Sequence, residues 1–179
     1  IAYRGTKMPN ALLVVDMVVG FMEEGHNLYC GDAAREIIPD VRLLIEEHRI
    51  EGSPVIFICD SHDPNDLEFE MFPIHCVTGT REAELITELQ EYEGDILPKR
   101  RYSAFFGTDL ENKLAIIAPD KITICGVCTD ICVMHTAADA RNRDYKVEVH
   151  ANTVASFDEE AHIQALDHME KILGASVVR

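Results

Sequence analysis

Runs of consecutive apolar residues recur along the chain, and they alternate with segments whose apolar residues return every three or four positions. The first pattern indicates strands buried on both faces of a sheet, and the second indicates amphipathic helices. Strands are predicted at 11–17, 55–60, 95–98, 121–125, 145–149 and 176–178. Helices are predicted at 33–50, 81–92, 108–118, 130–143 and 158–173. This alternation predicts a three-layer α/β/α fold around a six-stranded, mostly parallel, doubly wound sheet.

Polar residues mark the starts of three predicted helices. Asp32 and Asp158 are placed to accept a hydrogen bond from a backbone N–H group in the first turn. Thr108 and Glu111 have the spacing of a capping box. The segment 61–80 shows no periodicity, and an irregular connection of this length typically carries function.

Length and composition indicate a single domain covering residues 1–179, with a loose terminal arm at 1–9. The formal net charge of −16 argues against nucleic acid or an anionic membrane as a partner. Neither a secretory signal nor an apolar run of membrane-spanning length is visible, so we expect a cytoplasmic protein. In that compartment the six cysteines are expected to be free thiols.

Chemistry in an open parallel sheet collects at the carboxyl ends of its strands. Asp16 and Lys99 stand at two such ends, and Cys132 falls in the first turn of the helix after the fourth strand. Individually they can be a turn cap, a solvated base and a core residue. Together they supply a nucleophile, a carboxylate that accepts its proton, and a cation and helix N-terminus that favour the thiolate. The N–H groups of Cys128 and Cys132 are placed to bind an oxyanion.

The irregular segment carries a second group of candidates. Asp60, His62, Glu68 and His75 offer the mixed nitrogen and oxygen ligands that suit a divalent metal. The alternative is that the two histidines only cap turns in an acidic loop.

Three motifs together resemble those of the isochorismatase-like cysteine hydrolases, from Ala11 to the end of the chain. They are Asp16 after the first strand, Lys-Arg-Arg-Tyr-Ser-Ala-Phe from Lys99, and Gly-Val-Cys-Thr-Asp-Ile-Cys-Val from Gly126. The resemblance implies a Rossmann-like hydrolase fold, a homodimer or homotetramer, and a small-molecule amide as substrate. It also implies a catalytic triad and a cis peptide bond, namely Asp16, Lys99 and Cys132 for the triad and Val127–Cys128 for the bond.

Asp60-x-His62 and the run Phe72-Pro-Ile-His75 resemble the nicotinamidase branch of that family. There, Asp60, His62 and His75 match metal ligands. Glu68 stands where other members have a histidine, and Asp66 or Glu70 can take its place. Zinc is the favoured ion, and iron or manganese accepts the same ligands.

This branch implies hydrolysis of nicotinamide to nicotinic acid and ammonia through a thioester on Cys132, with the metal orienting the pyridine nitrogen. Phe21 and Phe72 would flank the ring and Tyr102 would close the pocket, although core packing equally explains Phe21. Two alternatives remain. One is a metal-independent hydrolase of an N-carbamoyl or ureido amide, and the other is a non-catalytic small-molecule-binding member of the fold.

Overall fold

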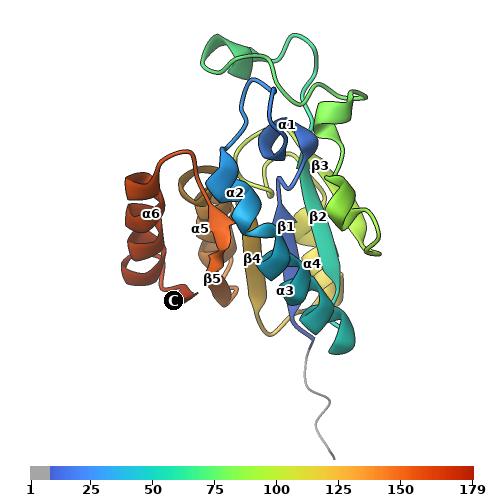
Figure 1. Ribbon diagram of the computed structural model, residues 1–179. Coiled ribbons are helices and arrows are strands. Elements are labelled where there is room, and N and C mark those ends of the chain that lie inside the picture. Colours follow the sequence, from blue (N-terminus) through green and yellow to red (C-terminus); the bar gives the residue numbers. More distant parts are fainter. Residues whose placement is uncertain (1–8) are drawn as a thin grey trace, which may run out of the picture.

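The computed structural model describes residues 9–179, so all but the last residue of the predicted terminal arm lies outside the described part. A six-stranded sheet of order β3-β2-β1-β4-β5-β6 forms the centre (Figure 1). Every adjacent pair is parallel, which confirms the predicted doubly wound sheet. Its strands are β1 (Ala11–Val15), β2 (Val55–Asp60), β3 (Asp95–Lys99), β4 (Ile122–Val127), β5 (Val147–Ala155) and β6 (Ser176–Val178).

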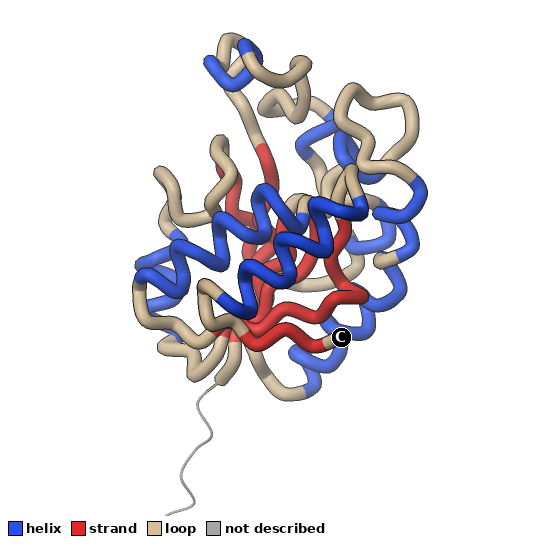
Figure 2. The backbone as a smooth tube through the Cα atoms, turned by 90° about the vertical axis from the view of Figure 1, so that its left-hand side faces the viewer, coloured by secondary structure: helices blue, strands red, loops and turns tan. Residues whose placement is uncertain are grey.

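Helices cover both faces of this sheet, as the side view in Figure 2 shows. One face packs on α1 (Val19–Met22), α2 (Asp32–Glu36) and α3 (Ile38–Ile50). The other packs on α4 (Leu110–Ile117), α5 (Met134–Asn142) and α6 (Glu159–Lys171). Side chains of β1 alternate between the two cores, with Leu12 and Val14 on the first face and Leu13 and Val15 on the second. Within the described residues, no helix combines the length and the apolar character needed to cross a membrane.

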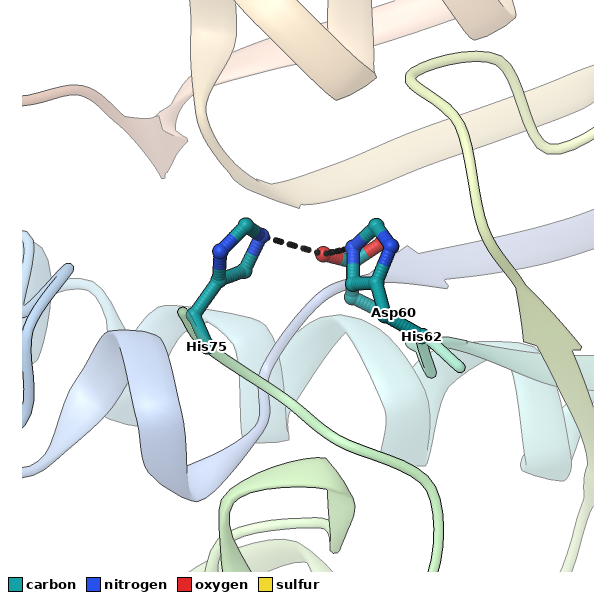
Figure 3. A group of neighbouring side chains, drawn as sticks. All are labelled: Asp60, His62 and His75. Atoms are coloured by element: carbon teal, nitrogen blue, oxygen red, sulfur yellow. Dashed lines mark hydrogen bonds and ion pairs between the residues drawn. The ribbon is translucent and has the colours of Figure 1, made fainter. Parts of the chain in front are cut away.

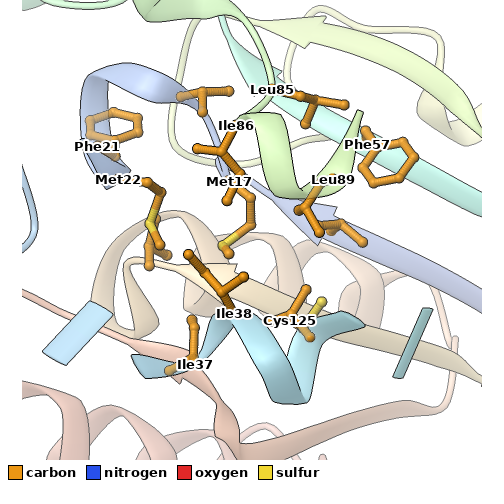
Figure 4. Packing of buried hydrophobic residues seen from close by; sticks show 14 of the residues in the cluster. Met17, Phe21, Met22, Ile37, Ile38, Phe57, Leu85, Ile86, Leu89 and Cys125 are labelled. Atoms are coloured by element: carbon orange, nitrogen blue, oxygen red, sulfur yellow. The ribbon is translucent and has the colours of Figure 1, made fainter. Parts of the chain in front are cut away.

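The predicted helix at 81–92 is wrong. The segment contains two short 3₁₀ turns, Arg81–Ala83 and Thr87–Leu89, joined by extended backbone. That extended piece pairs with the chain after β1, since Ile86 N–H donates to the Met17 carbonyl at 3.1 Å. The pairing places Leu85, Ile86 and Leu89 in the core of the first face, beside Met17 (Figure 4). Burial and backbone pairing therefore outweigh the local helical pattern here.

Two of the three predicted helix starts are also wrong. The predicted helix at 33–50 is split into α2 and α3, and Asp32 lies inside α2, where it accepts a hydrogen bond from the Tyr29 hydroxyl. Thr108 accepts from the Leu110 N–H group at 3.2 Å, so the capping box does not form. Asp158 does cap α6, accepting from a first-turn N–H group at 2.7 Å.

Gly126 brings β4 close to β1 just before the chain turns. Its φ of +110° lies in a region that L side chains rarely adopt, and a Cβ there would stand 1.9 Å from the Val15 carbonyl oxygen. Only glycine allows this approach. The pairing of β4 with β5 also shifts register between Ile124 and Gly126, and β5 continues to Ala155, beyond the predicted end at 149.

Candidate active site and metal-binding cluster

Three neighbouring strands deliver charged side chains to one point at the carboxyl edge of the sheet. Asp16 follows β1, Asp60 ends β2 and Lys99 ends β3. Cys132 comes from the π-helical turn Thr129–Val133, which follows β4 directly. All four residues are buried. The structure thus brings together the residues that the sequence placed at separate strand ends.

Lys99 lies at the centre of this group. Its Nζ stands 2.9 Å from Asp16 Oδ2, 2.8 Å from Asp60 Oδ1 and 3.4 Å from the Cys132 Sγ. Asp16 Oδ1 also accepts the backbone N–H of Asp60 at 2.9 Å. One ammonium therefore contacts both carboxylates and the thiol.

The electrostatic balance differs from the one predicted. Burial alone would lower the pKa of Lys99, but Asp16 and Asp60 raise it well above its ordinary value, so Lys99 is charged. Burial raises the pKa of Asp16 to about 6, against the opposing effect of Lys99. Burial also raises the pKa of Cys132 well above its ordinary value, although Lys99 opposes it. The resting site therefore favours a thiol beside a carboxylate, where the sequence predicted a thiolate.

A cluster of possible metal ligands adjoins Lys99 through Asp60. Figure 3 shows its three side chains. One carboxylate oxygen and one nitrogen from each of two histidines lie within 4.8 Å of one another, in Asp60, His62 and His75. Asp60 Oδ2 is 2.9 Å from His62 Nε2 and 3.3 Å from His75 Nε2. The Nδ1 of His62 is held by Asp66 at 3.1 Å, and that of His75 donates to the Pro73 carbonyl at 2.7 Å. This donor set fits a divalent ion. In both histidines a neighbouring oxygen holds Nδ1, which orients the ring and leaves Nε2 as the ligand atom.

Of the three candidates for a fourth ligand, only Glu68 faces the cluster. Its Oε1 is 4.0 Å from His62 Nε2 and 3.9 Å from His75 Nε2. Asp66 instead accepts two bonds from Arg101, at 2.8 and 3.0 Å, besides its contact with His62. Glu70 is exposed.

A cavity with about 370 Å³ of empty space, its open mouth included, lies between the cluster and the thiol. Its wall contains Asp16, Asp60, Glu68, His75, Cys128 and Cys132, together with apolar and aromatic side chains. Among the predicted pocket residues, Phe21, Phe72 and Tyr102 all line it. Phe21 lies 5.7 Å from the His75 ring, and Phe72 packs edge-on against both His75 and Tyr102 at 6.4 Å.

The turn that carries Cys132 is fixed by its backbone. The peptide bond between Val127 and Cys128 is cis, as the family resemblance implied. The Cys128 carbonyl accepts from the N–H groups of Ile131 and Val133, both at 3.1 Å. The side chains of both Cys128 and Cys132 border the cavity.

Sequence reasoning missed several residues of the cavity wall. It also missed Arg101, which holds Asp66 in place. Leu28, Ile131 and Phe157 also line the cavity. Phe157 follows the carboxyl end of β5, so the strand-end rule could have indicated it. Arg101 belongs to the motif that begins at Lys99, but nothing local shows that it binds Asp66.

The comparisons with known proteins agree with this geometry. An isochorismatase domain model matches residues 10–178. A nicotinamidase structure from Bacillus subtilis is 38% identical with a TM-score of 0.90, covering 96% of this chain and 100% of that one. An N-carbamoylsarcosine amidase from Thermoplasma acidophilum is 36% identical with a TM-score of 0.86, covering 96% of each chain. A pyrazinamidase from Pyrococcus horikoshii, solved in complex with zinc, is 32% identical with a TM-score of 0.87, covering 95% of this chain and 98% of that one.

The likeness thus extends over nearly the whole chain in both sequence and fold. The chain belongs to the isochorismatase family.

Proposed function

We propose that the chain is a nicotinamidase, a cysteine amidohydrolase that converts nicotinamide and water to nicotinic acid and ammonia. The observation that carries this proposal is that a single cavity has Cys132 in its wall together with Asp60, Glu68 and His75. A pyridine ring can then present its nitrogen to the metal-binding cluster and its amide carbon to the thiol. The apolar and aromatic side chains in the cavity wall suit a flat ring, and the similarity to the B. subtilis nicotinamidase supports the choice.

The side chains can carry both halves of an amide hydrolysis. The Cys132 sulfur attacks the amide carbon while its proton passes to Asp16, which lies beside it. Lys99 stabilises the sulfur as it becomes anionic, and the N–H groups of Cys128 and Cys132 are proposed to stabilise the oxyanion. Asp16 then protonates the leaving nitrogen, so that the C–N bond breaks and ammonia leaves a thioester. Water cleaves the thioester, releasing nicotinic acid and returning a proton to Cys132.

The proposed metal site follows from the donor set. We propose that Asp60, His62, His75 and Glu68 bind a divalent ion, with zinc first and iron or manganese as alternatives. Bound there, such an ion supplies a Lewis acid that orients the pyridine nitrogen. The zinc complex of the P. horikoshii pyrazinamidase supports this choice. Phe21 and Phe72 are proposed to flank the ring, and Tyr102 to close the pocket.

The direct test is ammonia release from nicotinamide and from its pyrazine analogue by zinc-loaded protein. We expect turnover of both, and none by the Cys132→Ala variant in the same assay. Absence of turnover by the loaded wild-type protein would reject nicotinamide as the substrate.

A metal-independent hydrolase of an N-carbamoyl amide is the second candidate, favoured by the similarity to the T. acidophilum amidase. Chelation separates the two functions. A nicotinamidase loses activity when the ion is stripped and regains it when zinc is restored, whereas an N-carbamoylsarcosine hydrolase keeps its rate. The cytoplasmic location and the assembly as a homodimer or homotetramer stay predictions. Light scattering tests the assembly.

A further inference from the structure

Two cysteines that the proposed reaction does not use as nucleophiles lie against each other. The sulfur atoms of Cys30 and Cys128 are 3.5 Å apart, although 98 positions separate the residues in the chain. Each residue is only 5% exposed. Within residues 9–179 this is the only pair of thiols found in hydrogen-bonding contact.

The two thiols border different hollows of the molecule. Cys128 lines the cavity that also contains Cys132. Cys30 lines a separate groove, together with Gly31, Asp32 and residues 154–157. Phe157 borders both. Cys30 therefore borders the groove and Cys128 the cavity, so a small reagent that enters the groove meets Cys30 first.

The two cysteines lie on backbone of different kinds. Cys128 belongs to the turn whose carbonyl accepts two N–H groups, so its position is fixed. Cys30 lies in the connection between α1 and α2 and precedes Gly31, which has a φ of +89° and open space around it. A disulfide bond is about 2.05 Å long, so the sulfurs must approach by about 1.5 Å. The Cys30 N–H donates to the Phe21 carbonyl at 2.8 Å, so the movement has to come from rotation of the Cys30 side chain and from the backbone at Gly31.

We propose that Cys30 and Cys128 form an oxidative modification site, which a hydroperoxide converts to an intramolecular disulfide. Peroxide oxidises the Cys30 thiol to a sulfenic acid and is itself reduced to one water molecule. The Cys128 sulfur then attacks the Cys30 sulfur, the S–S bond forms, and the sulfenic hydroxyl leaves with the Cys128 proton as a second water molecule. A small dithiol reverses the reaction by exchange.

The order of the two steps follows from the position of Cys30 at the groove and from the surroundings of Cys128. The hydrogen bond with Cys30, and then burial, raise the pKa of Cys128 well above its ordinary value, so Cys128 is the poorer first nucleophile. The hydrogen bond with the Cys30 thiol is the largest cause of the raised pKa of Cys128, and oxidation of Cys30 replaces that thiol. The disulfide would tie the Cys132 turn to the segment that carries Leu28, another residue of the cavity wall.

The test maps the bond directly and does not depend on any activity. The Cys132→Ala variant of the 179-residue chain, which lacks the thiol beside Lys99, is treated with hydrogen peroxide, alkylated under denaturing conditions and digested with trypsin without reduction. We expect alkylated thiols to fall from five to three. We also expect the peptide 8–35 to be linked to the peptide 122–141, with fragmentation placing the bond at Cys128 and dithiothreitol removing it.

Two variants in the same background serve as controls. Cys30→Ser should abolish the link, whereas Cys125→Ala should leave it, since Cys125 is on the same tryptic peptide but shows no contact with Cys30. Conversion of Cys30 to sulfinic or sulfonic acid without a link, or a link to any other cysteine, would overturn the proposal. Because these masses do not require turnover, the result stands even if nicotinamide proves not to be the substrate.

Discussion

The two sides of the cavity are built by different means. The side from β1, β2 and β3 consists of buried charges, and Asp16, Asp60 and Lys99 hold one another in place through ion pairs of 2.8–2.9 Å. The side from β4 carries no charged group among its cavity-lining residues Val127, Cys128, Ile131 and Cys132. There the position of the thiol follows from the backbone of a single turn.

Because of this difference, the residues that stabilise the fold and the residues proposed to react are the same on one side of the cavity and different on the other. On the charged side a side chain with a proposed catalytic role also neutralises its neighbours, so its loss leaves buried charge behind. On the thiol side the proposed nucleophile is a small end group, and the fold depends on the backbone that presents it. We therefore expect substitutions on the two sides to differ in which property they change.

Cys132→Ala tests the thiol side and should have the largest effect. We expect amide hydrolysis to fall by about 10⁴-fold or more, because the nucleophile is gone. The free energy of unfolding should change by only about 1 kcal/mol, since little volume is lost. Cys125→Ala, in the core of the first face, is the matched control and should keep full activity. A stability loss of similar size in both variants, measured by urea denaturation, would show that the loss of activity in Cys132→Ala does not come from unfolding.

Lys99→Met tests the charged side. It leaves Asp16 and Asp60 buried without a cation, so we expect a loss of about 3–5 kcal/mol in stability as well as loss of activity. Lys113→Met removes a lysine that pairs with exposed Asp95 at 2.9 Å, and little change is expected. If Lys99→Met denatured at the wild-type urea concentration, the ion pairs would not be what holds this side together.

Gly126→Ala tests the backbone beneath the thiol. The added Cβ meets the Val15 carbonyl, and its φ is unfavourable, so we expect a loss of about 3 kcal/mol in stability. Gly52→Ala is the control, because Gly52 has a φ of +72° but open space around it. It should lose only about 1 kcal/mol. Equal losses for the two variants would mean that the close approach of β4 to β1 is relaxed easily.

Asp66→Asn should have the smallest effect, and on metal binding rather than on folding. The Asp66 carboxylate contacts the Nδ1 of His62 and accepts a hydrogen bond from Arg101. Its loss removes the group that orients the His62 ring, so we expect zinc affinity to fall by about 10–100-fold. Competition with a chromogenic chelator measures it, and the exposed Glu70→Gln is the control. An unchanged affinity would show that His62 needs no such support.

The sequence was sufficient to predict the sheet, because its central strands β1, β2 and β4 are predominantly apolar runs whose pattern does not depend on distant partners. It was insufficient for 81–92, where extended pairing with the chain after β1 replaces a helix. The helix starts at Asp32 and Thr108 failed for a related reason. Their side chains bond other partners two or three residues away, which spacing rules do not distinguish from a cap.

The candidate site was predicted in outline for the same reason as the sheet. Parallel strands bring their carboxyl ends together, so Asp16, Asp60 and Lys99 had to converge. What spacing could not give is the protonation of Cys132, which depends on how deeply the folded chain buries it. Nor could it give the contact of Cys30 with Cys128, because the two segments meet only in three dimensions.

The two oxygens of the Asp60 carboxylate have separate partners, Oδ1 with Lys99 and Oδ2 with the imidazoles of His62 and His75. During divergence within such a family, the histidines can be exchanged one at a time, and the lysine keeps its counter-ion throughout. Replacing the aspartate would disturb both arrangements in one step. We therefore expect descendants that abandon metal to lose the imidazoles and retain the aspartate.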